Sequence, residues 1–252
     1  MKLFKHKHDA SQDSLLHGVA LITDYAPMSR VSEEYKTLRT NILYAKADDP
    51  IHTLLITSAG PSEGKSTVSG NIAATFAKQG LRTILLDTDM RRPTVHATFG
   101  IQNNFGLVDL LTGEEDNEKL QRACRQTEIE NLTILPCGPI PPNPSELLAS
   151  KRMTRLLKGL TNAFDLVILD APPVISVTDA QVLGSRADAT VLVVPYGIAQ
   201  KSMVMEAKSL LDQVNANIIG VVMNRVPASE RQNRYGYYYD AYYNNDGKKH
   251  SK

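Results

Sequence analysis

Short apolar runs rich in β-branched residues recur along the chain, separated by polar or glycine-containing segments. Runs of this kind are typical of parallel strands that are buried on both faces. They cover residues 52–57, 82–87, 131–135, 165–170, 189–195 and 218–223. Apolar residues between the runs recur at helical spacing, as at Val68, Ile72 and Phe76. This alternation predicts an α/β fold with an open, mainly parallel sheet, helices on both of its faces and ligands beyond the carboxyl ends of the strands.

The same pattern divides the chain into three parts. Residues 1–30 form a polar, weakly patterned arm, residues 31–226 hold the strand and helix alternation, and residues 227–252 form a tail. The tail contains six of the ten tyrosines but no Leu, Ile, Met or Phe, so it has almost nothing aliphatic to bury. Aromatic alternation also fits an edge strand. The polar surroundings favour a solvated, disordered tail.

Length and composition limit the class of protein. A chain of 252 residues with 42% hydrophobic residues suits one large domain, and a net charge of +1 gives no argument for nucleic-acid binding. No apolar run approaches the roughly 20 residues of a membrane span, and no signal-peptide core follows Met1. We therefore expect a cytoplasmic chain without direct membrane insertion. Its two cysteines are too few for a disulfide framework and are expected to be reduced.

The segment after the first run matches a phosphate-binding loop with alanine in its first glycine position. The order of strand, loop and helix lets backbone amides and a helix N-terminus face anionic phosphates. Lys65 would reach the β- and γ-phosphates, and Ser66 would offer its hydroxyl to Mg²⁺. The loop predicts a nucleoside triphosphate as ligand. The residues expected to contact it are Gly60, Pro61, Ser62, Glu63, Gly64, Lys65, Ser66 and Thr67.

Three aspartates follow apolar runs and are expected at the same sheet edge as this loop. Asp87 and Asp89 end the second run, and alternation along an extended segment points both carboxylates the same way. Asp170 ends the fourth run. Each aspartate alone fits a helix cap as well as a metal ligand. Together beside one phosphate loop, they favour metal binding and chemistry.

Five features combined resemble the bacterial tyrosine kinases of capsule and exopolysaccharide synthesis, the CpsD/CapB-like family. They are SAGPSEGKST, LLDTDMRRP, ILDAPP, GPIPPNPSELL and the terminal tyrosine cluster. The resemblance implies a P-loop tyrosine-kinase domain that uses ATP and Mg²⁺, phosphorylates its own tail and regulates polysaccharide synthesis and export. The phosphoacceptors would be Tyr235, Tyr237, Tyr238, Tyr239, Tyr242 and Tyr243.

The resemblance also suggests roles for the site residues. Asp87 would accept the phenolic proton and contact the metal, Asp89 would lie in the same region, and Asp170 would hold the metal through water. The sequence by itself does not separate Asp87 from Asp89. Asn224, after the last run, is similar to a family residue near the adenine base, although asparagine is equally a turn residue.

Assembly and partners are further implications of the resemblance. Glu33, Lys36 and Arg39 recur every three residues on a helix expected from about residue 32 to residue 44. They match a family triplet of glutamate and two arginines that contacts the next subunit of a ring, except that lysine lacks the planar fork of arginine. A solvated face with local ion pairs is the alternative. The resemblance further implies a transmembrane, polysaccharide co-polymerase-type activator that recruits the chain to the inner face of the membrane, and an opposing tyrosine phosphatase.

The competing class is the MinD/ParA-type positioning ATPases without kinase activity, which share the sheet and both aspartate-bearing strands. Their loop opens with a signature lysine that reaches the partner's nucleotide, and this chain has Ala59, Gly60 and Pro61 there. Its tail also lacks the apolar stripe of a membrane-targeting helix. Both differences favour the kinase.

Overall fold

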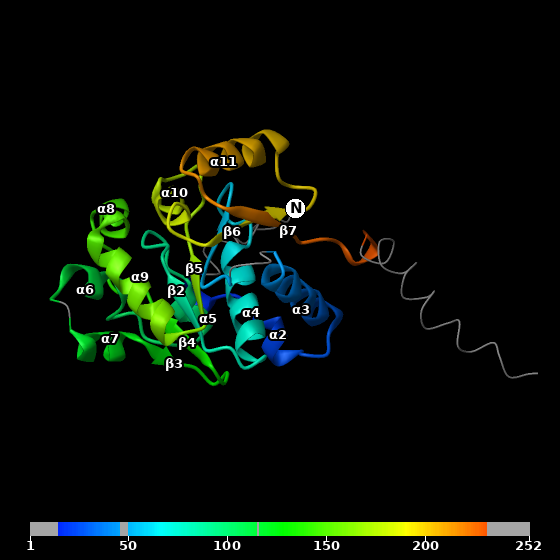
Figure 1. Ribbon diagram of the computed structural model, residues 1–252. Coiled ribbons are helices and arrows are strands. Elements are labelled where there is room, and N and C mark those ends of the chain that lie inside the picture. The colour runs from blue at the N-terminus through cyan, green and yellow to red at the C-terminus, as the bar shows by residue number, and fades with distance from the viewer. Residues whose placement is uncertain (1–14, 46–49, 115, 231–252) are drawn as a thin grey trace, which may run out of the picture.

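The computed structural model describes residues 15–45, 50–114 and 116–230. Within these ranges a seven-stranded sheet runs in the order β3-β4-β2-β5-β1-β6-β7 (Figure 1). The strands are β1 (Thr53–Ser58), β2 (Thr83–Asp87), β3 (Arg125–Gln126), β4 (Leu132–Leu135), β5 (Leu166–Asp170), β6 (Ala189–Pro195) and β7 (Ile218–Asn224). All pairings are parallel except that of β3 with β4. The predicted α/β fold is therefore confirmed.

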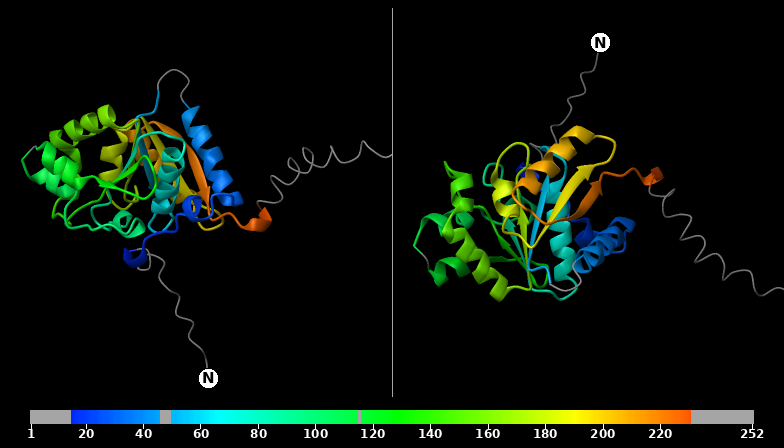
Figure 2. Two further views of the ribbon diagram at one scale, coloured as in Figure 1. Left: turned by 90° about the horizontal axis from the view of Figure 1, so that it is seen from below. Right: turned by 45° about the horizontal axis from the view of Figure 1, so that its top comes forward.

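Helices lie on both faces of the sheet, as expected; Figure 2 shows the blue and cyan helices on one side and the green to orange helices on the other. The longer helices are α3 (Arg30–Leu43), α4 (Lys65–Ala77), α9 (Lys151–Ala163) and α11 (Lys201–Gln213). The shorter ones are α2 (Ile22–Tyr25), α5 (Val95–Thr98), α6 (Leu107–Thr112), α7 (Asn117–Ala123), α8 (Pro144–Ala149) and α10 (Asp179–Gly184).

All six apolar runs form strands, with ends shifted by one residue at most. Strand β3 was missed because its two residues carry no apolar alternation. The short helices were missed for a similar reason, since four to seven residues make too few turns to show a helical period.

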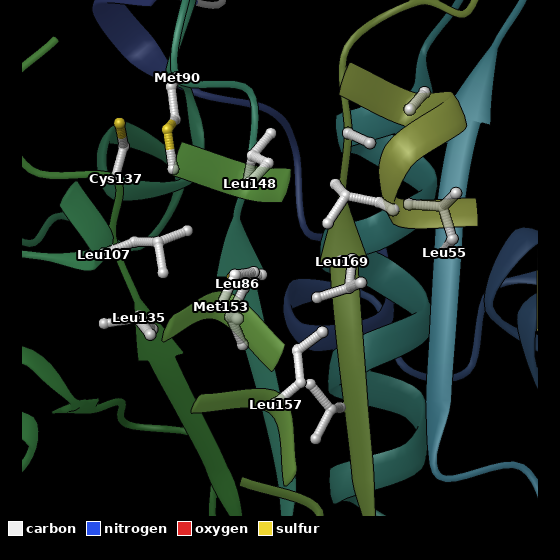
Figure 3. Close-up of a cluster of buried hydrophobic side chains, with 14 of the residues drawn as sticks. Leu55, Leu86, Met90, Leu107, Leu135, Cys137, Leu148, Met153, Leu157 and Leu169 are labelled. Atoms are coloured by element: carbon white, nitrogen blue, oxygen red, sulfur yellow. The ribbon is translucent and has the colours of Figure 1, made fainter. Parts of the chain in front are cut away.

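Alternate residues of the strands build two hydrophobic clusters, one on each face of the sheet. Leu55 and Leu169 face the first cluster (Figure 3), and residues of α6 and α8 to α11 cover it. Leu54 and Ile56 face the second, which α3, α4 and α5 cover. The central strands are buried on both faces, so their carboxyl ends are fixed in position. The loops that follow β1, β2 and β5 therefore begin at fixed positions.

The described part of the predicted arm packs against the domain. Thr23 is buried, and both its N–H and its hydroxyl lie 3.0 Å from Oδ1 of Asn71 on α4. The Ser32 hydroxyl donates to the carbonyl of Ala26 at 2.7 Å. The sequence pattern missed this packing because it depends on polar side chains rather than on an apolar period.

No helix within the described ranges is long and apolar enough to cross a bilayer.

Candidate active site

The loop between β1 and α4 requires glycine at Gly64. Gly64 has a φ of 94° and precedes the first residue of α4. A Cβ atom there would lie 2.1 Å from Nδ2 of Asn224. Glu63 turns its carboxylate toward the backbone N–H groups that open the loop, including that of Gly60, although burial is the larger influence and raises its pKa. The carboxylate of Glu63 therefore stabilises the loop through hydrogen bonds to the loop's own backbone.

Lys65 begins α4 and points toward the end of β2. Its Nζ lies 2.8 Å from Oδ2 of Asp89, and both side chains are largely buried. Burial by itself would lower the pKa of Lys65, but the charges of Asp170 and Asp89 outweigh it and raise that pKa. Oδ1 of Asp89 accepts from the backbone N–H of Arg92 at 3.1 Å. Both carboxylate oxygens of Asp89 thus have protein partners.

Asp87 has one engaged oxygen and one unused oxygen. Its Oδ2 accepts from the backbone N–H groups of Thr94 and Val95, each at 3.0 Å, so it caps α5. Its Oδ1 is buried without a hydrogen-bond partner. Burial, and then the negative charge of Asp170, raise the pKa of Asp87 well above its usual value. Asp87 therefore caps a helix and still presents a free carboxylate oxygen.

Asp170, like Asp87, has one carboxylate oxygen that is hydrogen-bonded and one that is not. Strand pairing sets it beside Asp87 in the sheet. Its Oδ1 accepts from the Ser69 hydroxyl at 2.9 Å, whereas its Oδ2 is buried without a partner. Burial raises the pKa of Asp170, and the positive charge of Lys65 and the Ser66 hydroxyl partly oppose this rise.

The charges of this cluster fit a divalent cation. The carboxyl groups of Asp87, Asp89 and Asp170 outnumber the single ammonium of Lys65 on which they act. Two of the buried oxygens, one each from Asp87 and Asp170, have no partner. Across the described ranges, no group of three or more His, Cys, Asp or Glu residues could hold a metal by itself. Mg²⁺ commonly uses one or two carboxylates plus phosphate oxygens, so the residues present suit it.

The end of β7 holds the other side of the loop. Nδ2 of Asn224 donates to the carbonyl of Glu63 at 3.2 Å, and Nη2 of Arg225 donates to the carbonyl of Ser62 at 2.5 Å. Oδ1 of Asn224 accepts from the backbone N–H of Arg225 at 2.8 Å. Ser62 and Arg225 both adopt a positive φ, near 59° and 58°. We call Asn224 and Arg225 the β7 clamp.

Two adjacent arginines after Asp89 differ in their surroundings. Arg91 donates from Nε to Asp179 at 3.0 Å and from Nη2 to Ser145 at 3.2 Å. Asp179 is fully buried and also accepts from the Ser145 hydroxyl. This network ties the DTDMRRP loop to α8 and α10. Arg92 instead lines the pocket beside Lys65 and Ser66, which we call the phosphate pocket.

The phosphate pocket joins most of the predicted loop residues to several that the sequence did not single out. Pro61, Ser62, Gly64, Lys65, Ser66, Thr67 and Asp89 were predicted and line it. Leu15, Val19, Arg92, Thr94, Pro173 and Arg225 also line it. Arg92 and Pro173 stand within quoted motifs and Arg225 follows Asn224, which was a usable signal. Leu15 and Val19 carried none, since they lie far from the loop in sequence.

The predicted assembly triplet lies on α3, away from the phosphate pocket. Nζ of Lys36 pairs with Oε1 of Glu33 at 2.6 Å, and both side chains are about half exposed. Arg39 turns toward α4, where its Nη1 donates to the carbonyl of Thr75 at 3.4 Å. The triplet is thus a surface ion pair plus an arginine that contacts the domain. The six predicted phosphoacceptor tyrosines lie outside the described residues.

Comparisons with known proteins place this site in context. A family model described as an AAA domain matches residues 60–218. The Bacillus subtilis (strain 168) tyrosine-protein kinase YwqD is 42% identical over 212 residues, which cover 84% of this chain and 88% of that protein.

Solved structures give the same picture. The chimerical protein CapA2B2 is 40% identical and aligns with a TM-score of 0.78 over 82% of this chain and 90% of its own. The septum site-determining protein MinD of Pyrococcus horikoshii, solved with Mg-ADP, aligns with a TM-score of 0.59 over 72% of this chain and 76% of its own, at 22% identity. MinD therefore shares the fold, whereas the more similar sequence is a tyrosine kinase.

Proposed function

The chain belongs to the CpsD/CapB-like family of bacterial tyrosine-protein kinases, and we propose that it transfers the γ-phosphoryl group of ATP to tyrosines of its own C-terminal tail. One observation carries the chemistry. A phosphate-loop lysine and three carboxylates meet at one sheet edge, and two buried carboxylate oxygens have no protein partner. Such oxygens are suited to coordinate a metal ion or to accept a proton from the substrate.

The loop supplies the phosphate-binding part of the reaction. Backbone amides of the loop and the N-terminus of α4 face the phosphates, and Lys65 neutralises the β- and γ-phosphates. To do so, Lys65 would exchange its contact with Asp89 for phosphate oxygens, because its Nζ lies 2.8 Å from Oδ2 of Asp89. Asn224 holds the loop on the side where the adenine base would lie.

Mg²⁺ would be held by the Ser66 hydroxyl and Asp87, with Asp170 acting through water. When bound, it offsets the negative charge that develops on the phosphate oxygens. The unpartnered Oδ1 of Asp87 and Oδ2 of Asp170 are the protein atoms that fit this role.

In the chemical step, the phenol oxygen forms a bond to the γ-phosphorus while the bond between that phosphorus and the β-γ bridging oxygen breaks. ADP leaves, and the phenolic proton passes to Asp87. Between the two candidates, Asp87 is preferred because it has a free oxygen, whereas both oxygens of Asp89 are engaged. Burial raises the pKa of Asp87, which makes its carboxylate a better base.

The biological setting follows from the relatives. We infer a role in capsule or exopolysaccharide synthesis and export, with a tyrosine phosphatase as antagonist. The CapA2B2 chimera supports a CapA-type membrane protein as the activator that brings the chain to the inner face of the membrane. Glu33, Lys36 and Arg39 would contact the neighbouring subunit of a ring, and the tail of one subunit would enter the site of another.

The test is phosphotyrosine mapping. Purified protein is incubated with ATP and Mg²⁺, with and without the cytoplasmic segment of a CapA-type activator, and modified sites are identified by mass spectrometry. Phosphate is expected on the tail tyrosines in the parent chain and not in Lys65→Met. ATP hydrolysis without any phosphotyrosine would instead support a positioning ATPase.

A mixing experiment tests transfer between subunits. A Lys65→Met chain with an intact tail is combined with an active chain whose six tail tyrosines are phenylalanine. Phosphate on the inactive chain's tail supports the proposal. An unmodified tail, under conditions where the parent protein is heavily phosphorylated, contradicts it.

A further inference from the structure

The segment around Val19 is fixed across the helix that follows the phosphate loop. The Val19 N–H donates to Oγ1 of Thr98 at 3.0 Å. Gly18 has a φ of 69°, and a Cβ atom there would lie 2.3 Å from the backbone nitrogen of Thr98, so the chain passes too close for any other residue. Nδ2 of Asn71 donates to the carbonyl of Ala20 at 2.8 Å. Residues 18–20 are therefore anchored to both α5 and α4.

A small residue on α4 makes room for this segment. A Cβ atom on Gly70 would lie 3.1 Å from Cδ2 of Leu21 and 4.0 Å from Cγ2 of Val19. Leu21 also packs against the second hydrophobic cluster. These contacts fix Val19 on the wall of the phosphate pocket, which Leu15 also lines.

The order of strands shows which side of the pocket this wall occupies. Thr98 belongs to α5, which follows β2 and is capped by Asp87. Strand β7, which carries the β7 clamp, lies at the opposite end of the sheet beyond β1 and β6. Leu15 and Val19 therefore stand on the carboxylate side of the loop, away from the side assigned to the adenine base.

Hydrocarbon side chains contribute little to binding phosphate or Mg²⁺, whereas an aromatic ring gains from contact with them. We propose that Leu15 and Val19 form one wall of the acceptor subsite and pack against the phenol ring of the incoming tyrosine. This inference rests on the proposed kinase function and adds a substrate-binding role for the N-terminal segment. The wall would guide the phenol oxygen toward the carboxylate side of the phosphate loop.

The test measures an external acceptor. The full-length chain with its six tail tyrosines changed to phenylalanine is assayed with ATP, Mg²⁺ and a synthetic peptide of the sequence RYGYYYDAYYNND. Leu15→Ala together with Val19→Ala is expected to raise the KM for the peptide about tenfold, from the lost apolar contact. The dissociation constant for ATP and the slow hydrolysis of ATP by water should stay within about twofold of the parent values.

The matched control is Leu16→Ala, because Leu16 is 76% exposed and does not line the pocket. Leu15→Met with Val19→Ile should retain the parent KM, and thermal melts of all variants report folding. If the double alanine variant does not fold, Leu15→Ala alone is measured, with a rise in KM of about threefold expected.

Three results would overturn the proposal. An unchanged KM for the peptide would show that Leu15 and Val19 do not bind the acceptor. A parallel loss of ATP affinity would show that they contact the nucleotide. A gain in rate would show that the segment blocks access of the acceptor to the site. A parent chain that makes no phosphotyrosine would refute the kinase function itself, which is a separate outcome.

Discussion

On its β7 side the phosphate loop contacts side chains that hold it, whereas on its β2 side it faces carboxylates whose oxygens are partly free. The β7 clamp donates to two loop carbonyls. The carboxylates of Asp87 and Asp170 each use one oxygen for structure and leave the other buried without a partner.

This difference separates two tasks that use the same kinds of polar groups. A satisfied hydrogen bond stabilises one geometry, while an unsatisfied buried oxygen costs free energy in the ligand-free protein. Such a cost is retained at sites that bind something else. The β7 side should therefore affect nucleotide affinity, and the β2 side should affect chemistry and metal binding.

The largest effect is expected from Asp87→Asn, which removes the proposed base. The rate of tyrosine phosphorylation should fall about 100- to 1,000-fold, since general-base catalysis contributes this much. Rates of phosphotyrosine formation measured at saturating ATP and Mg²⁺ test this point. An Asp89→Asn chain with the greater loss would transfer the role of base to Asp89.

The second prediction concerns stability without metal. The pKa of Asp170 is raised in the folded state, so between its unfolded and folded pKa values the folded protein holds a proton that the unfolded chain has released. The contribution of Asp170 to the stability of the parent chain is thus greatest below the unfolded pKa and is lost as pH rises through the folded pKa. Asp170→Asn has no such loss, so its Tm at pH 7 should exceed that of the parent.

Magnesium provides the control for this prediction. Adding Mg²⁺ with ADP should raise the Tm of the parent chain more than that of Asp170→Asn, because the variant has lost one carboxylate of the proposed site. Calorimetric scans at pH 4 and pH 7 separate the two effects. A variant that is less stable than its parent at pH 7 would show that the Asp170 carboxylate is structural.

A smaller effect is expected on the β7 side. Arg225→Ala removes one hydrogen bond to the carbonyl of Ser62 at an exposed position. The affinity for ATP should fall about three- to tenfold, while the rate at saturating ATP changes less than twofold. Arg225→Lys is a useful comparison, since it keeps the charge but not the fork of donors. A large loss of rate at saturating ATP would place Arg225 in the chemical step.

The sequence predicted the sheet and the phosphate loop well, because both follow from local patterns. Buried strands need continuous apolar runs, and the loop needs Gly64 and Lys65 at fixed spacing. The three aspartates were also predicted, since the ends of parallel strands meet at one edge. The sequence did not predict which carboxylate oxygen is hydrogen-bonded and which has no partner, because that depends on which oxygen each neighbouring N–H or hydroxyl contacts.

Two features lay beyond any local pattern. The partnership of Arg91 with Asp179 joins residues 88 positions apart. The contribution of Leu15 and Val19 to the pocket depends on anchors in α4 and α5. Polar contacts over such separations leave no period in the sequence, so the packed part of the arm was missed.

The smallest effect on the folded chain is expected at α3, far from both sides of the loop. The pair of Glu33 and Lys36 is exposed, so replacing both with alanine should change the free energy of unfolding by less than about 1 kcal/mol. The same change should reduce assembly, measured as mass by light scattering, while ATP affinity is retained. Arg39→Ala is the informative comparison, because Arg39 contacts the carbonyl of Thr75 within its own domain. If the double variant keeps the mass of its parent and Arg39→Ala lowers it, the contact between subunits depends on Arg39 rather than on the exposed pair. If all three substitutions together leave the mass unchanged, α3 is not the surface through which the ring assembles.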